Sequence, residues 1–381
     1  MSNVNRTVPA EPARPVDISG GGEEEAVSTK PVSGEDGRPL QSKYVTDKLA
    51  PPITDLEGAF GVFHRIRQRL RAAVHGRDDV IDLIIIAVLA DGHVLLEDFP
   101  GSGKTTLAKA LGDCIIDDKP DDNIVTIRRI QFTPDLLPSD VTGTTVFDPN
   151  TNRFFFRPGP IFAHVVLADE INRTSPKVQS ALLEAMAEKQ VTVDNRTRQL
   201  DPFFLVIATQ NPLDLAGTFP LPNAQLDRFL FKIRMTHIAP QAEYEILKNF
   251  RTLKASADRD DLPRVTRTEI LDARTVVANQ IFVDDKVHQA LVSIGQRTRN
   301  DERILQGAST RALVLSVPAL QARAMTQRRN YVSSDDIDAL CDKIFSHRLE
   351  FAPGADEPAK VVKELCGQEL ERLAKGSLQR G

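Results

Sequence analysis

The stretch GHVLLEDFPGSGKTT, residues 92–106, joins a short apolar strand to a glycine-rich turn that ends in a lysine. Such a turn can direct several backbone N–H groups toward a phosphate, and the helix that follows adds its positive amino-terminal end. The general pattern, G-x-x-x-x-G-K-[ST], asks for a glycine where this chain has Asp98. Asp98 lies where the strand ends, at the mouth of the loop, so its carboxylate need not block phosphate binding.

Four residues of the turn would carry out three tasks in nucleotide binding. Gly101 and Gly103 can adopt backbone torsions that other residues reach only with strain. Lys104 would reach the β- and γ-phosphates of a nucleotide, and the Thr105 hydroxyl would ligate Mg²⁺. A glycine-rich turn before a helix, with no ligand at all, is the plainer alternative. Motifs elsewhere in the sequence help to decide between a nucleotide site and a turn without a ligand.

Composition and charge narrow the class of protein. The chain has 381 residues and a net charge of −5, which is enough length for two domains and too acidic for broad, sequence-independent nucleic-acid binding. Its three cysteines are far apart and form no C-x-x-C pair, a pattern typical of reduced thiols. The longest apolar run, residues 83–90, is too short to cross a bilayer, and the amino-terminus has no apolar signal core. We therefore expect a soluble, cytoplasmic protein.

The chain divides into four segments by composition. Residues 1–50 are rich in Pro, Gly, Ser and charge, and are predicted to form a disordered tail that solubilises the protein or docks a partner. Short apolar strands alternate with helices over residues 51–238, which predicts an α/β domain with a mostly parallel sheet covered on both faces. Residues 239–350 lack strand signals and predict an all-helical domain. Residues 351–381 are expected to be a helical extension or tail.

Three local signals refine this outline. Thr54-x-x-Glu57 has the form of a capping box that would begin the first helix. Residues 142–160 and 190–202 each contain two short strand patterns around a turn sequence, and both are predicted to be β-hairpins inserted into the α/β alternation.

Polar side chains follow two further strands of the predicted sheet. The stretch HVVLADEINR, residues 164–173, ends its apolar run in Asp169 and Glu170. Ligands of parallel sheets bind at the carboxyl edge of the strands, where Asp169 would hold Mg²⁺ through water and Glu170 would polarise the attacking water. The stretch PFFLVIATQNP, residues 202–212, ends in an amide at the same edge. Asn211 could hydrogen-bond the lytic water or the γ-phosphate, or could cap the following turn.

Two arginines lie next to helix and strand boundaries. Arg228, in AQLDRF, comes just before the last predicted strand, and Arg311, in GASTRALVLS, lies in the first turn of a helix of the helical domain. A surface salt bridge, usually worth less than about 1 kcal/mol, is the plain interpretation of each arginine in isolation.

Five stretches of the chain together resemble the MoxR family of AAA+ ATPases. The resemblance covers roughly residues 56–349, and the first glycine of the loop is often replaced in this family, which accommodates Asp98. It implies an α/β AAA+ P-loop NTPase core with a parallel five-stranded sheet, two inserted β-hairpins and a C-terminal all-helical lid. The stretches are GHVLLEDFPGSGKTTLAKAL, RIQFTPDLLPSDVTGT, RPGPIFAHVVLADEINRTSPKVQSALLEAMAEKQVTV, FLVIATQNPLDLAGTFPLPNAQLDRFL and GASTRA.

The resemblance also implies a role for each candidate residue. Asp169 and Glu170 match the Walker B acids and Asn211 matches sensor 1. Arg228 matches the arginine finger, which would reach the nucleotide of a neighbouring subunit, and Arg311 matches the sensor 2 arginine, which would contact the γ-phosphate from the lid. The Walker A, or cofactor-binding, residues are Pro100, Gly101, Ser102, Gly103, Lys104, Thr105 and Thr106. Gln131, at the end of the second sheet strand, matches a polar residue that restrains the catalytic acid.

ATP and Mg²⁺ are the cofactors that the resemblance implies. It also implies self-association into a ring, such as a hexamer, and chaperone-like remodelling of protein clients, with von Willebrand factor A domain proteins as partners. A nucleic-acid motor would need basic hairpin tips, and Asp148 and Asp194 offset part of the positive charge there. A nucleotide switch with little hydrolysis would not need Glu170, Asn211 and both arginines. Neither nucleic-acid nor membrane partners are expected.

Overall fold

A computed structural model describes residues 44–46, 49–97, 102–119, 121, 123–212, 217–257 and 261–378. Most of the predicted tail, residues 1–50, lies outside this part of the chain. So do Asp98, Pro100 and Gly101 of the predicted phosphate loop.

Two helices precede the sheet, α1 (Leu56–Ala73) and α2 (Asp78–Leu89). Helix α1 begins after Asp55, whose extended backbone lets its carboxylate accept the N–H of Gly58 at 2.8 Å. The predicted capping box at Thr54 is therefore wrong by one residue. The physical reason is that the aspartate carboxylate already satisfies the free N–H of the first turn.

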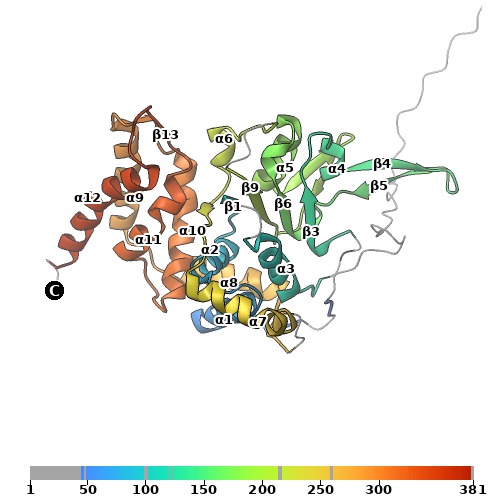
Figure 1. Cartoon of the computed structure of the whole chain (residues 1–381), viewed down its shortest axis with the longest axis horizontal. Coiled ribbons are helices and arrows are strands. Elements are labelled where there is room, and N and C mark those ends of the chain that lie inside the picture. Colours follow the sequence, from blue (N-terminus) through green and yellow to red (C-terminus); the bar gives the residue numbers. More distant parts are fainter. Residues whose placement is uncertain are drawn as a thin grey trace, which may run out of the picture.

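Five parallel strands form the central sheet in the order β10-β1-β9-β6-β3 (Figure 1), as predicted. Their bounds are β1 Val94–Glu97, β3 Val125–Gln131, β6 Ala163–Asp169, β9 Leu205–Gln210 and β10 Phe231–Arg234. Every residue of β6 is buried, because helices cover both faces of the sheet. Since all five strands run the same way, the residues that follow β1, β6 and β9 meet at one edge.

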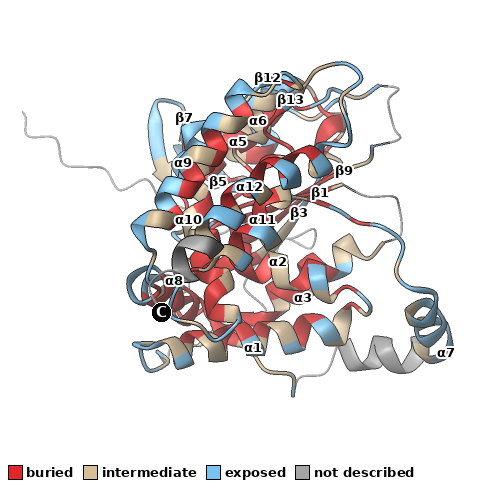
Figure 2. Ribbon diagram, turned by 90° about the vertical axis from the view of Figure 1, so that its left-hand side faces the viewer, coloured by how far each residue is buried: buried red, intermediate tan, exposed pale blue. Residues whose placement is uncertain are grey.

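Side chains alternate between two apolar layers along each strand. Leu96 joins the core formed with α1, α2 and α3 (Lys104–Cys114), whereas its neighbour Leu95 joins the core beneath α5 (Pro176–Glu188). Figure 2 shows this buried interior between the helical layers.

Both predicted hairpins are present. Strand β4 (Gly143–Asp148) pairs antiparallel with β5 (Arg153–Pro158), and β7 (Gln190–Val193) pairs with β8 (Arg196–Gln199). The β4–β5 hairpin extends well beyond the body of the protein (Figure 1). Near its tip, Phe147 and Phe154 lie opposite each other on the two strands, with ring centroids 5.2 Å apart, and are 46% and 67% exposed.

In the described residues six helices follow the sheet, and Figure 1 shows them in two groups. Helix α8 packs against α1, where Arg65 pairs with Glu269 at 2.6 Å, and so covers the α/β layer. Helices α9 to α12 form the other group, and α12 packs against α9 and α11 with Val361, Val362 and Cys366 buried. The helices are α7 Pro240–Ala257, α8 Arg267–Gln280, α9 Asp285–Asn300, α10 Thr310–Thr326, α11 Ser334–Phe345 and α12 Pro358–Leu378.

Short elements complete the fold. They are β2 Ile115–Ile116 paired with β11 Val265–Thr266, β12 Ile304–Gln306 paired with β13 Glu350–Phe351, the helices α4 Pro138–Thr142 and α6 Asn223–Leu226, and the 3₁₀ turn η1 Ile171–Arg173. None of the helices in the described residues is both long and apolar enough to cross a membrane. The division of the chain at residues 50, 238 and 350 stays a prediction.

Candidate functional site

The amino-terminus of α3 offers an open, polar position for an anion. Gly103, the residue before α3, has φ +95°, a left-handed conformation that favours glycine. A Cβ at Gly103 would meet only Val74 Cγ1 among the described atoms, at 3.9 Å. Beside it, Ser102 Oγ is buried and has no hydrogen-bond partner among the described residues.

Three predicted nucleotide ligands occupy the first turn of α3. Lys104, Thr105 and Thr106 begin this 11-residue helix, whose first-turn N–H groups and positive dipole end point in the same direction. The unsatisfied Ser102 hydroxyl and the helix end fit a nucleotide phosphate. Hydroxyl and carboxylate oxygens are also the ligand atoms that Mg²⁺ prefers.

The acids predicted to hold the metal and to activate water lie at the end of β6. Asp169 is nearly buried, and its Oδ1 accepts the hydroxyl of Thr209 at 2.6 Å. Its other oxygen, Oδ2, accepts Arg129 Nη2, also at 2.6 Å. Thr209 also accepts the backbone N–H of Glu170 at 2.9 Å, and so positions both acids from the neighbouring strand.

Glu170 has a left-handed backbone, with φ 57° and ψ 49°. A non-glycine residue in this conformation costs on the order of 1–3 kcal/mol and is typical of functional sites. Its Oε2 accepts Gln131 Nε2 at 2.8 Å and pairs with Arg173 Nε at 3.2 Å. The contact with Gln131 is the one that the predicted restraint of the acid requires.

A second polar group at this edge links β1 and β9. Glu97, the last residue of β1, accepts Gln210 Nε2 at 2.9 Å and pairs with Lys232 Nζ at 3.0 Å. Asn211 follows β9 directly, so it lies on the strand between the one that carries the phosphate loop and the one that carries the acids. The structure thus brings Lys104, Thr105, Asp169, Glu170 and Asn211 to the carboxyl edge of the sheet.

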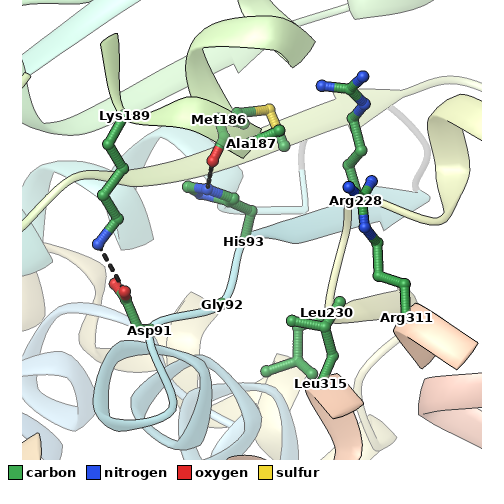
Figure 3. A pocket seen from close by; sticks show the side chains of 10 residues that line it. All are labelled: Asp91, Gly92, His93, Met186, Ala187, Lys189, Arg228, Leu230, Arg311 and Leu315. Atoms are coloured by element: carbon green, nitrogen blue, oxygen red, sulfur yellow. Dashed lines mark hydrogen bonds and ion pairs between the residues drawn. The ribbon is translucent and has the colours of Figure 1, made fainter. Parts of the chain in front are cut away.

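The two arginines lie at the opposite edge. Arg228 and Arg311 line one cavity of about 180 Å³ together with Gly92 and His93, which precede β1 (Figure 3). Arg228 donates to the backbone oxygen of Leu183. Within the described residues, neither guanidinium forms an ion pair with a carboxylate.

The two arginines give this cavity its positive charge, and His93 adds none because it is neutral. His93 Nδ1 accepts the N–H of Val206 at 3.0 Å, so Nε2 carries the proton and donates to Met186 O at 3.2 Å. Burial lowers the pKa of His93 to about 4. Lys189 also lines the cavity, but it pairs with Asp91 at 2.5 Å, which leaves the two arginines to set the local field.

Asp227 fixes the two arginine-bearing segments to each other. Its Oδ2 accepts Ser309 Oγ at 2.9 Å, and Ser309 caps the helix that carries Arg311. Its Oδ1 accepts Arg348 Nε at 3.0 Å, from the segment that follows α11. Burial lowers the pKa of Arg348 to about 10, against the attraction of Asp227. The segments that carry Arg228 and Arg311 are therefore joined through Asp227.

Sequence reasoning missed Thr209, Arg129 and Asp227. A signal existed for Arg129: residues two apart on a strand share a face, so Arg129 lies beside Gln131. Nothing in the sequence pairs Asp227 with Arg348, which is 121 residues away along the chain.

Comparisons with known proteins agree with this geometry. A family model of AAA ATPases associated with various cellular activities matches residues 93–231, and an AAA lid domain model matches residues 296–365. The chain is 45% identical to the Bacillus subtilis protein YeaC, over 78% of this chain and 91% of YeaC. It is 35% identical to the Mycobacterium tuberculosis Chaperone MoxR1, over 79% of each chain.

A solved structure has the same fold. The crystal structure of a protein assigned as an ATPase, from Cytophaga hutchinsonii, superposes with a TM-score of 0.71 and 31% identity, and the match covers 81% of this chain and 95% of that chain. The chain belongs to the MoxR family of AAA+ ATPases.

Proposed function

We propose that this ATPase works as a head-to-tail ring, with six subunits, that uses ATP hydrolysis to remodel or mature protein complexes in the cytoplasm. The observation that carries the proposal is the position of Arg228 and Arg311. Both line one cavity at the amino edge of the sheet, whereas Lys104 begins the helix at the carboxyl edge. A complete hydrolysis site therefore needs two copies of the chain.

The hydrolytic half of the site would work as follows. Lys104 binds the β- and γ-phosphates, and the oxygens of Thr105 and Asp169 hold Mg²⁺. When bound, Mg²⁺ neutralises charge that develops on the transferring phosphoryl group. Glu170 polarises the attacking water once its contact with Gln131 is broken, and Asn211 orients that water.

A neighbouring subunit would supply Arg228 and Arg311, because the direction of the strands places these arginines at the edge of the sheet opposite the phosphate loop. Phe231 of β10 lies beside Val94 of β1, so the segment before β10 and the segment before β1 are at the same end of the sheet. The length of β1, at about 3.3 Å per residue, lies between Arg228 and the loop that holds its own nucleotide. A head-to-tail contact places this cavity over the neighbour's phosphates, and such contacts close into rings.

The sequence predicts that Arg311 contacts the γ-phosphate of its own chain, and its position in the same cavity as Arg228 supports a different assignment. Helices α7 and α8 pass beneath the sheet before the chain reaches α9–α12, so α10 begins beside Arg228 instead of beside Lys104. We propose that Arg311 acts together with Arg228 on the neighbour's nucleotide.

Protein clients are favoured over nucleic acid by the hairpin surface. The exposed pair Phe147 and Phe154 offers apolar area near a projecting tip. One of the matched relatives carries the name chaperone. We propose an apolar polypeptide segment as the client and a von Willebrand factor A domain protein as a partner.

Mixing two inactive variants tests the ring model. Lys104→Ala removes the phosphate ligand of its own site, and Arg228→Ala removes the residue supplied to the neighbour. Co-assembled mixtures should regain ATPase activity, because an arginine-deficient subunit still binds ATP beside a lysine-deficient neighbour that supplies the arginine. A matched control mixes Lys104→Ala with Glu170→Gln, which both act in their own site and should not rescue each other. No rescue in the first mixture, with assembly verified by light scattering, would reject the proposal.

A further inference from the structure

Arg129 contacts both Asp169 and the residue that restrains Glu170. Its guanidinium donates to Asp169 Oδ2 from Nη2 at 2.6 Å and from Nε at 3.2 Å. The same Nη2 donates to Gln131 Oε1 at 2.7 Å. One planar group thus touches the predicted metal ligand and the residue that restrains the catalytic acid.

The contact with Gln131 fixes which way its amide points. Because Arg129 can only donate, it must bind the carbonyl oxygen of Gln131, and this directs the Nε2 donor toward Glu170, 2.8 Å away. If the Gln131 amide were reversed, its carbonyl would face the Glu170 carboxylate and repel it. Arg129 is therefore what makes the Gln131–Glu170 hydrogen bond favourable.

The contact with Asp169 occupies the oxygen that faces outward. Oδ1 is taken by the hydroxyl of Thr209, so Oδ2 is the oxygen left for a cation, and the guanidinium lies there. The Arg129 side chain is 50% exposed, so it can swing into solvent when a metal ion takes over the charge of Asp169.

We infer that Arg129 is a positioning residue that occupies the cation position of Asp169 in the metal-free protein and that couples metal binding to the release of Glu170. When Asp169 takes up a metal ion, Arg129 must leave Oδ2. Gln131 then loses the donor that orients its amide, and its hold on Glu170 weakens. Both acids thus become available in one event. The inference rests on the roles proposed above for Asp169 and Glu170.

The test measures metal binding directly. Mn²⁺, with saturating ADP, is the probe, and the loss of the free Mn²⁺ signal in electron paramagnetic resonance reports binding. Arg129→Gln should bind Mn²⁺ about three- to tenfold more tightly, since a charge-assisted contact that competes for Asp169 is gone, discounted for its exposure. The matched control is Arg173→Gln, which removes an equal charge from the contact with Glu170 and leaves Asp169 untouched, so its Mn²⁺ affinity should stay within twofold of the parent.

A second comparison tests the link through Gln131. Gln131→Ala alone should tighten Mn²⁺ binding slightly, because Arg129 loses a partner that holds it in place. The same change in the Arg129→Gln background should have no effect, because the competitor is already absent. Arg129→Lys keeps the charge but lacks the fork that binds two acceptors, so it should give an intermediate affinity, and it supplies the comparison if Arg129→Gln does not fold.

Two outcomes would overturn the inference. One is Mn²⁺ affinity in Arg129→Gln that is unchanged or weaker. The other is an equal gain in Arg173→Gln, which would indicate a general charge effect. Asp169→Asn separates these outcomes from a failure of the site assignment: if Asp169→Asn binds Mn²⁺ as the parent does, Asp169 is not a metal ligand and the proposed hydrolytic site itself is wrong.

Discussion

Glu170 concentrates the local constraints of the site in a single residue. Its left-handed backbone is held by the hydrogen bond from its N–H to Thr209, and its carboxylate is held by Gln131 and Arg173. Strain of this kind persists only where the surroundings over-determine it. The carboxylate is therefore held in one orientation. A change to glutamine removes its charge and basicity but keeps the shape of the side chain.

Glu170→Gln should bind ATP with affinity close to that of the parent and lose at least about a hundredfold in turnover, because an amide cannot polarise water. Fluorescent nucleotide titration and a phosphate-release assay measure the two quantities separately. Glu302→Gln, an exposed acid far along the chain, is the matched control and should change neither. Parental turnover in Glu170→Gln would show that another residue activates the water.

His164 forms a separate, buried charge cluster on β6. Its Nε2 lies 3.5 Å from Asp117 Oδ2 and its Nδ1 lies 3.5 Å from Asp201 Oδ1, and these are ion pairs instead of well-aligned hydrogen bonds. Burial alone would lower the pKa of His164, but the two carboxylates outweigh it and raise the pKa to about 8. Arg267 shares Asp201 at 2.9 Å.

The raised pKa makes folding stability depend on pH. The imidazolium is favoured in the folded state, so its contribution is fully present below the unfolded pKa of about 6.5 and is lost as the pH rises through about 8. Denaturant unfolding of the parent and of His164→Gln should differ more at pH 6 than at pH 9, by on the order of 1–2 kcal/mol. His288→Gln, at an exposed histidine, is the control. A difference that does not change with pH would contradict a charged His164.

At the scale of elements, the two hairpins differ in how much they pack against the rest of the protein. Arg198 of β8 lies over the ring of Phe156 in β5, 3.8 Å from its centroid, so the second hairpin packs on the first. Replacing the 196–198 segment would therefore disturb packing as well as the tip. The exposed pair Phe147 and Phe154 is the cleaner target for separating client contact from folding.

The double variant Phe147→Ser with Phe154→Ser should keep basal ATPase activity within twofold, because neither ring touches the nucleotide edge. Its melting temperature should stay close to that of the parent, since both rings are already exposed to water. Stimulation of the ATPase by denatured casein, used as a polypeptide probe, should fall. The control is Leu305→Ser, an exposed apolar residue of β12. A tenfold loss of basal activity would instead make the hairpin part of the hydrolytic site.

At the scale of the whole molecule, mixing variants tests whether Arg311 serves the nucleotide of its own subunit or that of a neighbour. If Arg228 and Arg311 both serve the neighbour, Arg228→Ala and Arg311→Ala cannot rescue each other, because every subunit supplies an incomplete pair. If Arg311 served its own nucleotide, the same mixture would contain complete sites and regain activity. We expect no rescue in that mixture and rescue of each variant by Lys104→Ala. The readout is specific ATPase activity, which should also rise with protein concentration.

Features that depend on neighbouring residues and on strand direction could be predicted from the sequence. Glycines and a lysine before a helix predicted the phosphate loop, whose residues 102–106 lie at the start of α3. Apolar runs predicted a mostly parallel sheet, and the family resemblance implied that it has five strands. Parallel pairing alone requires that Asp169, Glu170 and Asn211 share an edge with Lys104.

Contacts between segments that are distant in the sequence could not be predicted, because they depend on how the folded chain packs. The pairing of Arg129 with Asp169, the support of Thr209 and the anchoring of Asp227 to Arg348 each join residues that no local period relates. Arg311 is the clearest case. Its helix was predicted correctly, but its side of the molecule depends on how α7 and α8 pack beneath the sheet. That path is set by the burial of whole helix faces, which a motif does not encode.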